Sequence, residues 1–196
     1  MKKITLLLVT VFTFGFVNAQ DKEDMSFGVK AGLNISSLSN IDEDGVNKDP
    51  LIGFHVGFFG EFMISDKFAI QPELLYSSQG VKFDSEGEKA EIKLDYINIP
   101  IMAKYYVADA FSLELGPQIG FLVSSDLESG GVSVDLKDET KSIDVSLGFG
   151  ASYNFAENFM FGARYNLGLT RVQEDLSPGE SESKNSVFQI SLGYKF

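Results

Sequence analysis

The chain has 196 residues and a formal net charge of −12, and it contains 18 Phe and 7 Tyr but no Cys and no Trp. This length suffices for one domain with a sizeable core and is too short for two. The missing cysteines exclude a disulfide scaffold, a thiolate metal site, a cysteine nucleophile and a lipid anchor on cysteine. The acidic charge argues against nucleic acid as a partner, because phosphate binding needs a basic face.

The first nineteen residues are typical of a cleaved secretion signal. Lys2 and Lys3 precede an apolar or weakly polar stretch at 4–17, and Val17 and Ala19 are small residues at the two positions that signal peptidase reads. The stretch is shorter than the roughly 20 residues that a membrane-spanning helix needs. The predicted organisation is therefore a signal peptide at 1–19 and one mature domain at 20–196, with the charge changing from −12 to −14 on loss of the two lysines.

The mature chain alternates apolar and polar residues with a period of two, which predicts strands rather than helices. No run in it reaches the length of a transmembrane helix without charges or turn residues. If the protein is integral to a membrane, it must therefore be a closed barrel, because only helices and closed barrels satisfy every backbone group in lipid. The eight predicted strands are 26–38, 51–64, 68–78, 91–107, 111–124, 142–155, 159–172 and 187–196.

Short and long connections alternate between these segments. Tight turns at 65–67, 108–110 and 156–158 alternate with longer polar loops near 39–50, 79–90, 125–141 and 173–186. This asymmetry is typical of outer-membrane barrels, with turns in the periplasm and loops outside. The predicted fold is an all-β, eight-stranded antiparallel up-and-down transmembrane β-barrel with both termini on the turn side.

One face of each segment is large and apolar, and the other is small, polar or charged. Alternation alone does not distinguish a membrane barrel from a soluble barrel that buries its apolar face. Three features favour lipid outside: aromatic residues near the tight turns, as in an interfacial girdle; glycines on the polar face, which suit a narrow interior; and a final strand that ends on Phe196. The girdle residues are Phe62, Phe68, Tyr105, Phe111, Phe155 and Phe159.

The polar face carries charged residues of both signs. An eight-stranded barrel is only wide enough for side chains to fill it, and charges in such a space must pair or become very costly. We therefore predict a plugged lumen crossed by salt bridges. Lys93 and Asp95 fall on the lipid-facing side, which requires that end of their strand to project beyond the membrane. The predicted network consists of Lys30, Lys104, Arg164, Lys195, Glu61, Glu73, Glu114 and Asp144, with hydrogen bonds completed by Gln71, Asn98, Gln118, Asn154, Asn166 and Gln189.

Several motifs occur in an order that resembles a known family. They are FAIQPELLYS at 68–77, YINIPIMAKY at 96–105, LGPQIG at 115–120, ARYNLGL at 163–169 and LGYKF at 192–196. Together they resemble the PorT-like outer-membrane β-barrel domain family of Bacteroidetes, over essentially the whole mature chain. The resemblance implies an eight-stranded barrel of OmpA/OmpX type in the cell outer membrane.

The resemblance carries over no catalytic residue, no cofactor and no metal ligand. The chain's end resembles the signal read by the barrel-assembly machinery, with Leu192, Tyr194 and Phe196 as its alternating apolar residues. The implied partners are outer-membrane lipid and lipopolysaccharide, the assembly machinery during insertion, and envelope proteins still to be identified. A monomer is compatible with this interpretation.

His55 is the only histidine, so a histidine metal site would need carboxylates alone to complete it. We interpret it as a lumen residue hydrogen-bonded to a neighbour. The predicted loops are acidic, which indicates either a solvated rim or divalent cation binding that bridges to lipopolysaccharide phosphates. Their acidic residues are Asp42, Glu43, Asp44, Asp49, Asp126, Glu128, Asp135, Asp138, Glu139, Glu174, Asp175, Glu180 and Glu182.

Three functional hypotheses follow from the sequence. The first is a non-enzymatic integral barrel with a structural or adhesive role, or a role accessory to an envelope or secretion complex. The second is a soluble secreted or periplasmic barrel that binds an apolar ligand in an inward-facing aromatic cavity. The third is a lipid-modifying barrel enzyme, in which His55 would act as the base beside a serine contributed by another strand.

Overall fold

The computed structural model describes residues 25–39, 47–85, 88–174 and 182–196, so the predicted signal peptide at 1–19 lies outside the described residues. All regular structure in the described part is β-strand. The strands are β1 (Met25–Leu38), β2 (Asn47–Ser65), β3 (Phe68–Ser85), β4 (Glu88–Ala108), β5 (Phe111–Ser129), β6 (Val132–Asp135), β7 (Ile143–Asn154), β8 (Phe159–Arg171) and β9 (Lys184–Lys195).

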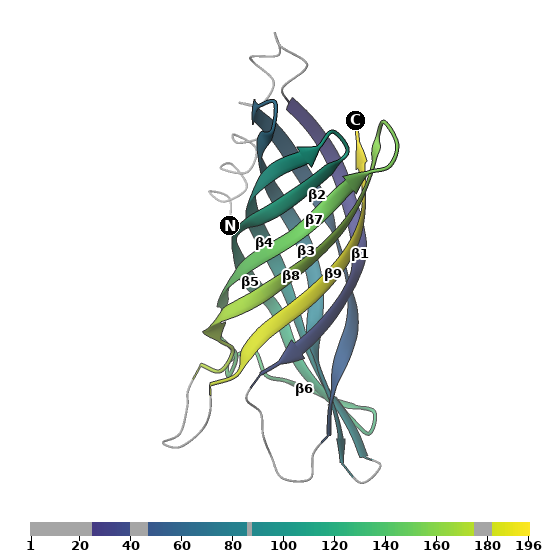
Figure 1. Ribbon diagram of the computed structural model, residues 1–196. Helices are drawn as coiled ribbons and strands as arrows, with labels where there is room; N and C mark the ends of the chain where they lie inside the picture. The colour runs from purple at the N-terminus through teal and green to yellow at the C-terminus, as the bar shows by residue number, and fades with distance from the viewer. Residues whose placement is uncertain (1–24, 40–46, 86–87, 175–181) are drawn as a thin grey trace, which may run out of the picture.

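Eight of the nine described strands form a closed ring. Each strand pairs antiparallel with its neighbours in the order β4-β3-β2-β1-β9-β8-β7-β5, and pairing between β4 and β5 closes the ring. Strand β6 lies outside the ring and pairs with β5 as a hairpin arm. The prediction of an eight-stranded antiparallel up-and-down barrel is confirmed (Figure 1).

The two ends of the barrel differ as the connections predicted. The three tight turns, the start of β1 and the C terminus lie at one end, called here the turn end, and the β5–β6 hairpin and the connection from β6 to β7 lie at the opposite end, called here the loop end (Figure 1). The β5–β6 hairpin turns at Gly130 and Gly131, whose φ angles are 57° and 82°. A two-residue hairpin turn with both central residues at positive φ matches the right-handed twist of its strands, and glycine adopts it without strain.

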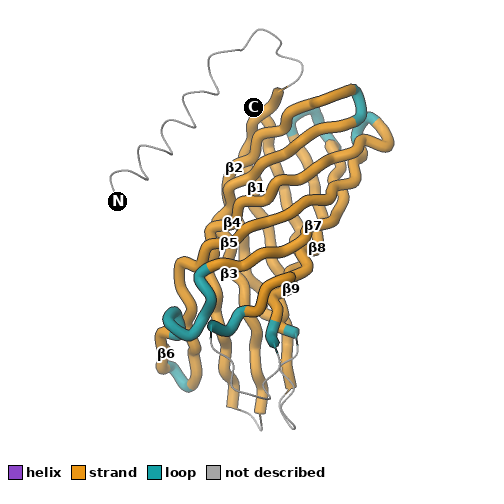
Figure 2. The backbone as a smooth tube through the Cα atoms, turned by 90° about the vertical axis from the view of Figure 1, so that its left-hand side faces the viewer, coloured by secondary structure: helices purple, strands orange, loops and turns teal. Residues whose placement is uncertain are grey.

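The prediction of loops at 79–90 and 125–141 is wrong over much of these ranges, which form strands instead. Strand β3 continues to Ser85, β4 begins at Glu88, and β5 continues to Ser129 before β6. Together, residues 79–85, 88–95, 124–129 and β6 form a projecting sheet at the loop end, with β6 at its margin (Figure 2). These segments looked like loops because their outward side chains become charged there, although the strand alternation continues.

Large apolar side chains cover the outside of the ring, with Phe58 58% and Leu115 54% exposed, while the inside is polar. The apolar surface ends towards the loop end at outward-facing polar residues that pair across strands, Ser78 with Asp95 and Asp95 with Ser124. On β4 the outward apolar residues run from 97 to 107, and at about 3.4 Å per residue and a tilt of about 40° this band is roughly 26 Å tall. We call it the lipid band.

This orientation is the reverse of the one that a soluble ligand-binding barrel requires. Such a barrel would enclose its aromatic residues, whereas Phe54, Phe121 and Phe149 are each about half exposed on the outside. The described residues contain no helix long and apolar enough to cross a membrane.

Candidate functional site

The centre of the barrel interior is filled by four buried charged side chains from four strands. Glu73 on β3 accepts hydrogen bonds from Lys30 Nζ on β1 (3.1 Å) and from Arg164 Nη2 on β8 (2.7 Å). Arg164 Nη1 bonds the other Glu73 oxygen (3.0 Å), while Arg164 Nε donates to Glu114 on β5 (2.6 Å). The guanidinium therefore bridges two carboxylates, one of them through two N–H groups, a geometry suited to arginine's planar fork.

A second cluster lies nearer the turn end. Glu61 accepts from Lys104 Nζ (2.5 Å) and from Lys195 Nζ (2.6 Å), one at each carboxylate oxygen. Gln71 connects the two clusters, since its Oε1 accepts from Lys104 (3.1 Å) and its Nε2 donates to Glu73 (2.7 Å). A cavity of about 680 Å³ opens at this end of the barrel, where Glu61, Tyr106 and Lys195 contribute to its lining.

Asp144 lies apart from these clusters. Seven of the eight predicted network residues form ion pairs with one another, but the Asp144 carboxylate forms none within the described residues and accepts a hydrogen bond from Thr170 Oγ1 (3.0 Å). The strand register explains the separation, because Asp144 pairs with Gly120, which offers no side chain. The expectation of an ion pair at Asp144 is wrong.

Amide and hydroxyl side chains occupy the interior between the central charges and the loop end. Gln189 Nε2 donates to Asn34 Oδ1 (3.0 Å), Asn166 Nδ2 donates to Gln189 Oε1 (2.9 Å), and Gln118 Nε2 donates to Ser146 (3.2 Å). Asn98 is 1% exposed, but its Nδ2 finds no partner in the part of the chain that the structure describes. The predicted amide network is therefore present in part, since Gln118, Asn166 and Gln189 form hydrogen bonds, while Asn98 Nδ2, Gln118 Oε1 and Asn166 Oδ1 find no partner in the described residues.

His55 belongs to the same layer. Its Nδ1 lies 2.8 Å from Asn34 Oδ1, which can only accept, so Nδ1 carries the proton and Nε2 accepts from Ser191 Oγ at 2.9 Å. The sequence could not identify this serine, because it is 136 positions away and is brought beside His55 only by closure of the barrel. A serine hydrogen-bonded to a histidine is the arrangement of an activated nucleophile. Here His55 is 1% and Ser191 4% exposed, so both are enclosed in the packed interior.

The glycines of the polar face allow this packing. A Cβ atom on Gly32 would lie 2.7 Å from His55 Cε1, and one on Gly28 would overlap the Phe59 ring. Both contacts are closer than real Cβ atoms make, so the interior is packed against bare backbone at these positions.

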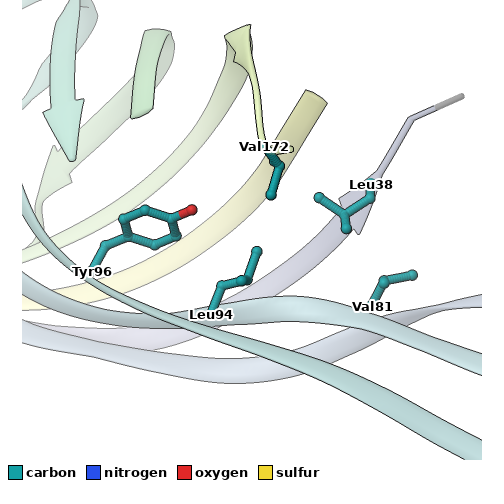
Figure 3. Packing of buried hydrophobic residues seen from close by; sticks show 5 residues of the cluster. All are labelled: Leu38, Val81, Leu94, Tyr96 and Val172. Atoms are coloured by element: carbon teal, nitrogen blue, oxygen red, sulfur yellow. The ribbon is translucent and has the colours of Figure 1, made fainter. Parts of the chain in front are cut away.

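The interior becomes apolar at the loop end. Five buried side chains, from β1, β3, β4 and the residue that follows β8, converge across the barrel (Figure 3). Phe83, Ile92 and Leu122 pack against them as partly buried neighbours. The five buried side chains, called here the apolar plug, close the barrel on the loop-end side of the amide layer. The five residues are Leu38, Val81, Leu94, Tyr96 and Val172.

The charged residues on the outward side of β4 lie beyond the lipid band. Lys93 Nζ donates to Glu128 on β5 (2.6 Å), and this hydrogen bond raises the pKa of Lys93. Lys82 on β3 pairs with Glu91 on β4 at 2.9 Å. The strand end therefore projects beyond the lipid band, as required. Lys93 forms an ion pair across the projecting sheet, and Asp95 accepts a hydrogen bond from Ser124 Oγ (3.2 Å).

The acidic loop residues do not assemble into a metal site in the described ranges, where no group of three or more His, Asp or Glu side chains is arranged to hold an ion. Glu128 instead pairs with Lys93, and Asp135 Oδ1 accepts from the backbone N–H of Lys137. Asp42, Glu43, Asp44, Asp175 and Glu180 lie outside the described residues.

The three predicted assembly residues all face outward at the turn end. Leu192 is 51%, Tyr194 39% and Phe196 74% exposed. Tyr194 contacts the rings of Phe159 and Phe196, with centroids 5.1 Å and 5.8 Å apart, as part of an aromatic belt at this end of the barrel.

These features define a class of protein. A closed antiparallel barrel with an apolar outer band, an aromatic belt at one end and an ion-paired interior is a transmembrane β-barrel. The chain belongs to the outer membrane protein beta-barrel domain family, whose model matches residues 18–174. It is therefore an outer-membrane β-barrel protein.

Solved structures show the same fold. Neisserial surface protein A superposes with a TM-score of 0.61 at 16% identity, over 89% of this chain and 100% of that protein. The attachment invasion locus protein Ail of Yersinia pestis gives 0.51 at 17% identity, over 88% of this chain and 99% of that protein. No curated protein sequence matches the chain.

Proposed function

We propose that this protein is a non-enzymatic integral outer-membrane barrel with a closed lumen. It acts through its extracellular surface in a structural or adhesive role, or as an accessory to an envelope or secretion complex. The observation that carries the proposal is the filled interior. The two charge clusters, the amide layer and the apolar plug follow one another from the turn end to the loop end, so side chains occupy the space that a pore would need.

Conductance tests this proposal. The full-length protein, folded in detergent and inserted into a planar bilayer, is expected to give no steady conductance, and its gel mobility should differ between unheated and boiled samples. The mobility shift verifies that the barrel is folded. A steady large conductance from a sample that shows the shift would overturn the closed lumen.

The outer surface gives a first indication of its partners. Ail was crystallised with the heparin analogue sucrose octasulfate, a polyanion. In the present protein, residues 125–141 contain five acidic and two basic residues. Like charges facing each other weaken binding, which argues against a polyanion as the ligand of this surface.

The buried position of His55 and Ser191 supports the absence of enzymatic activity. Replacing His55 with Ala should leave any lipid modification by membranes containing the protein unchanged. Loss of a lipid deacylation or acyl-transfer activity in the His55→Ala variant, with the gel shift retained, would instead favour the lipid-modifying enzyme.

Processing, assembly and family placement complete the proposal. We expect export by a signal peptide removed after Ala19, insertion by the barrel-assembly machinery through Leu192, Tyr194 and Phe196, and contact with lipopolysaccharide as a monomer. Membership of the PorT-like group of Bacteroidetes remains a prediction. N-terminal sequencing of the membrane-inserted protein should begin at Gln20, and any other mature start would contradict the cleavage site.

A further inference from the structure

The projecting sheet has two chemically different faces. Val81, Ile92, Leu127 and Val134 occupy one row of register partners across β3, β4, β5 and β6. The neighbouring row, which faces the other way, consists of Lys82, Glu91, Glu128 and Ser133. The sheet therefore keeps one apolar face beyond the lipid band, although lipid no longer surrounds it there.

The apolar face is covered at one margin and uncovered at the other. Val81 is fully buried in the apolar plug, Ile92 and Leu127 are partly buried, and Val134 is 51% exposed. Val132, two residues earlier on β6, is 64% exposed. The plug thus protects the β3 side of the face, while the β5–β6 hairpin holds its valines in open solvent.

Strand β6 also has a free edge. It forms one margin of the sheet, and the described residues place β5 beside it but no strand on its other side (Figure 2). Such an edge presents unpaired backbone N–H and C=O groups that can accept a further strand. Lipid is not the occupant, because the charged Lys93 and Asp95 separate this part of the sheet from the lipid band.

The charges around the hairpin indicate what the occupant must carry. Residues 125–141 carry five acidic and two basic residues, a net charge of −3, and one of the basic groups, the Lys137 ammonium, donates to the Val123 carbonyl oxygen at 2.7 Å. A second copy of this chain would bring an equally acidic hairpin against the first, which like-charge repulsion disfavours. A basic segment is the complementary partner.

We propose that the β5–β6 hairpin is a docking site for an extended basic segment of an extracellular partner protein. The segment adds a strand along the edge of β6, places apolar side chains on Leu127, Val132 and Val134, and directs basic side chains to the acidic surroundings. This site rests on the proposed function, since it supplies the surface through which a closed barrel would act.

Binding of defined peptides tests the site. The full-length protein in detergent is titrated into a fluorescein-labelled peptide of alternating Val and Lys, and in parallel into a matched peptide of alternating Val and Glu, with anisotropy as the readout. The Val/Lys peptide is expected to bind at least ten times more tightly than the Val/Glu peptide. The double variant Val132→Ser/Val134→Ser should weaken its binding at least tenfold. Val107→Ser, the same change at a valine 49% exposed at the turn end, should leave it unchanged.

Several outcomes would overturn the site. These are equal binding of the two peptides, no binding of either, or undiminished binding by the double variant. A reversible dimer in analytical ultracentrifugation that dissociates in the double variant would assign the face to a second copy. If deleting residues 41–45 raised the peptide affinity tenfold, the apolar face would be assigned to this loop of the same chain instead of a partner protein. Conductance of the same sample separates this test from the proposed function, because a closed barrel that fails to bind refutes the docking site alone.

Discussion

Arg164→Met is expected to be among the most destabilising single substitutions in this barrel. The guanidinium bridges Glu73 and Glu114 in the centre of the lumen, and all three side chains are at least nine-tenths buried. Glu73 would keep Lys30, but Glu114 would lose the ion pair that it makes within the described residues. Removing one partner of a buried ion pair leaves an uncompensated charge and costs about 3–5 kcal/mol.

Urea titration of the detergent-folded protein measures this loss, with far-UV circular dichroism and the gel shift as independent readouts. The matched control is Lys93→Met, which removes the exposed pair with Glu128, where the Lys93 side chain is 39% exposed. Such surface pairs contribute about 0–1 kcal/mol. The double variant Arg164→Met/Glu114→Gln should recover part of the loss, since it replaces the stranded carboxylate by a neutral amide.

The reasoning would be refuted if Arg164→Met and Lys93→Met lowered the free energy of unfolding equally. That result would mean that water enters the centre of the lumen and solvates Glu114. A double variant as unstable as Arg164→Met alone would show that the loss comes from packing of the long arginine side chain.

Three further substitutions probe other parts of the barrel. Leu94→Ala in the fully buried apolar plug should cost about 2–5 kcal/mol in the same titration, and a loss below 1 kcal/mol would mean that the plug is not packed. Gly32→Ala should cost about 1–3 kcal/mol, because its new methyl group would overlap the Ile190 backbone oxygen on β9 and the His55 ring. Gly162→Ala, whose new methyl group would meet nothing closer than 3.8 Å, should be tolerated, and equal losses at the two glycines would contradict the crowding argument. Phe196→Ala should reduce the amount of barrel assembled in cells more than Phe161→Ala, a lipid-facing control 47% exposed, and equal reductions would remove the assembly role of Phe196.

The strands and the side of each residue could be predicted from the sequence, because a period of two fixes which residues share a face. The ion-pair and hydrogen-bond partners of the inward side chains could not be predicted, because they depend on the register between neighbouring strands. Glu73 and Arg164 are 91 positions apart and meet only when the barrel closes. Asp144 shares the inward side with the other charges, yet the row through Gly120 gives it Thr170 instead of a cation.

The serine beside His55 was hidden for the same reason. Ser191 and His55 both pair with Gly32 on β1, one from each side, and the missing side chain at Gly32 lets them reach each other across it. The contact between His55 and Ser191 becomes apparent only when the register places both beside Gly32, and a single sequence does not reveal the register.

The projecting sheet did leave a signal in the sequence, in the phase of the alternation. Within the lipid band, β4 points Ile97 and Ile99 outward and Asn98 inward, whereas Leu94 and Tyr96 point inward and Asp95 outward. The apolar side of the strand thus changes faces between Tyr96 and Ile97, where two consecutive large apolar residues interrupt the alternation.

Solvent accounts for this change of phase. A strand surrounded by lipid must place its apolar side chains outside and its polar ones in the lumen, whereas a strand surrounded by water must do the reverse. The level at which the phase changes is therefore the level at which the barrel leaves the membrane. The register row of Ser78, Asp95 and Ser124 continues that boundary onto the strands on both sides of β4. Beyond it the barrel follows the rules of a soluble β-protein, which is why its interior there is the apolar plug and why an apolar face left uncovered on β6 calls for a partner.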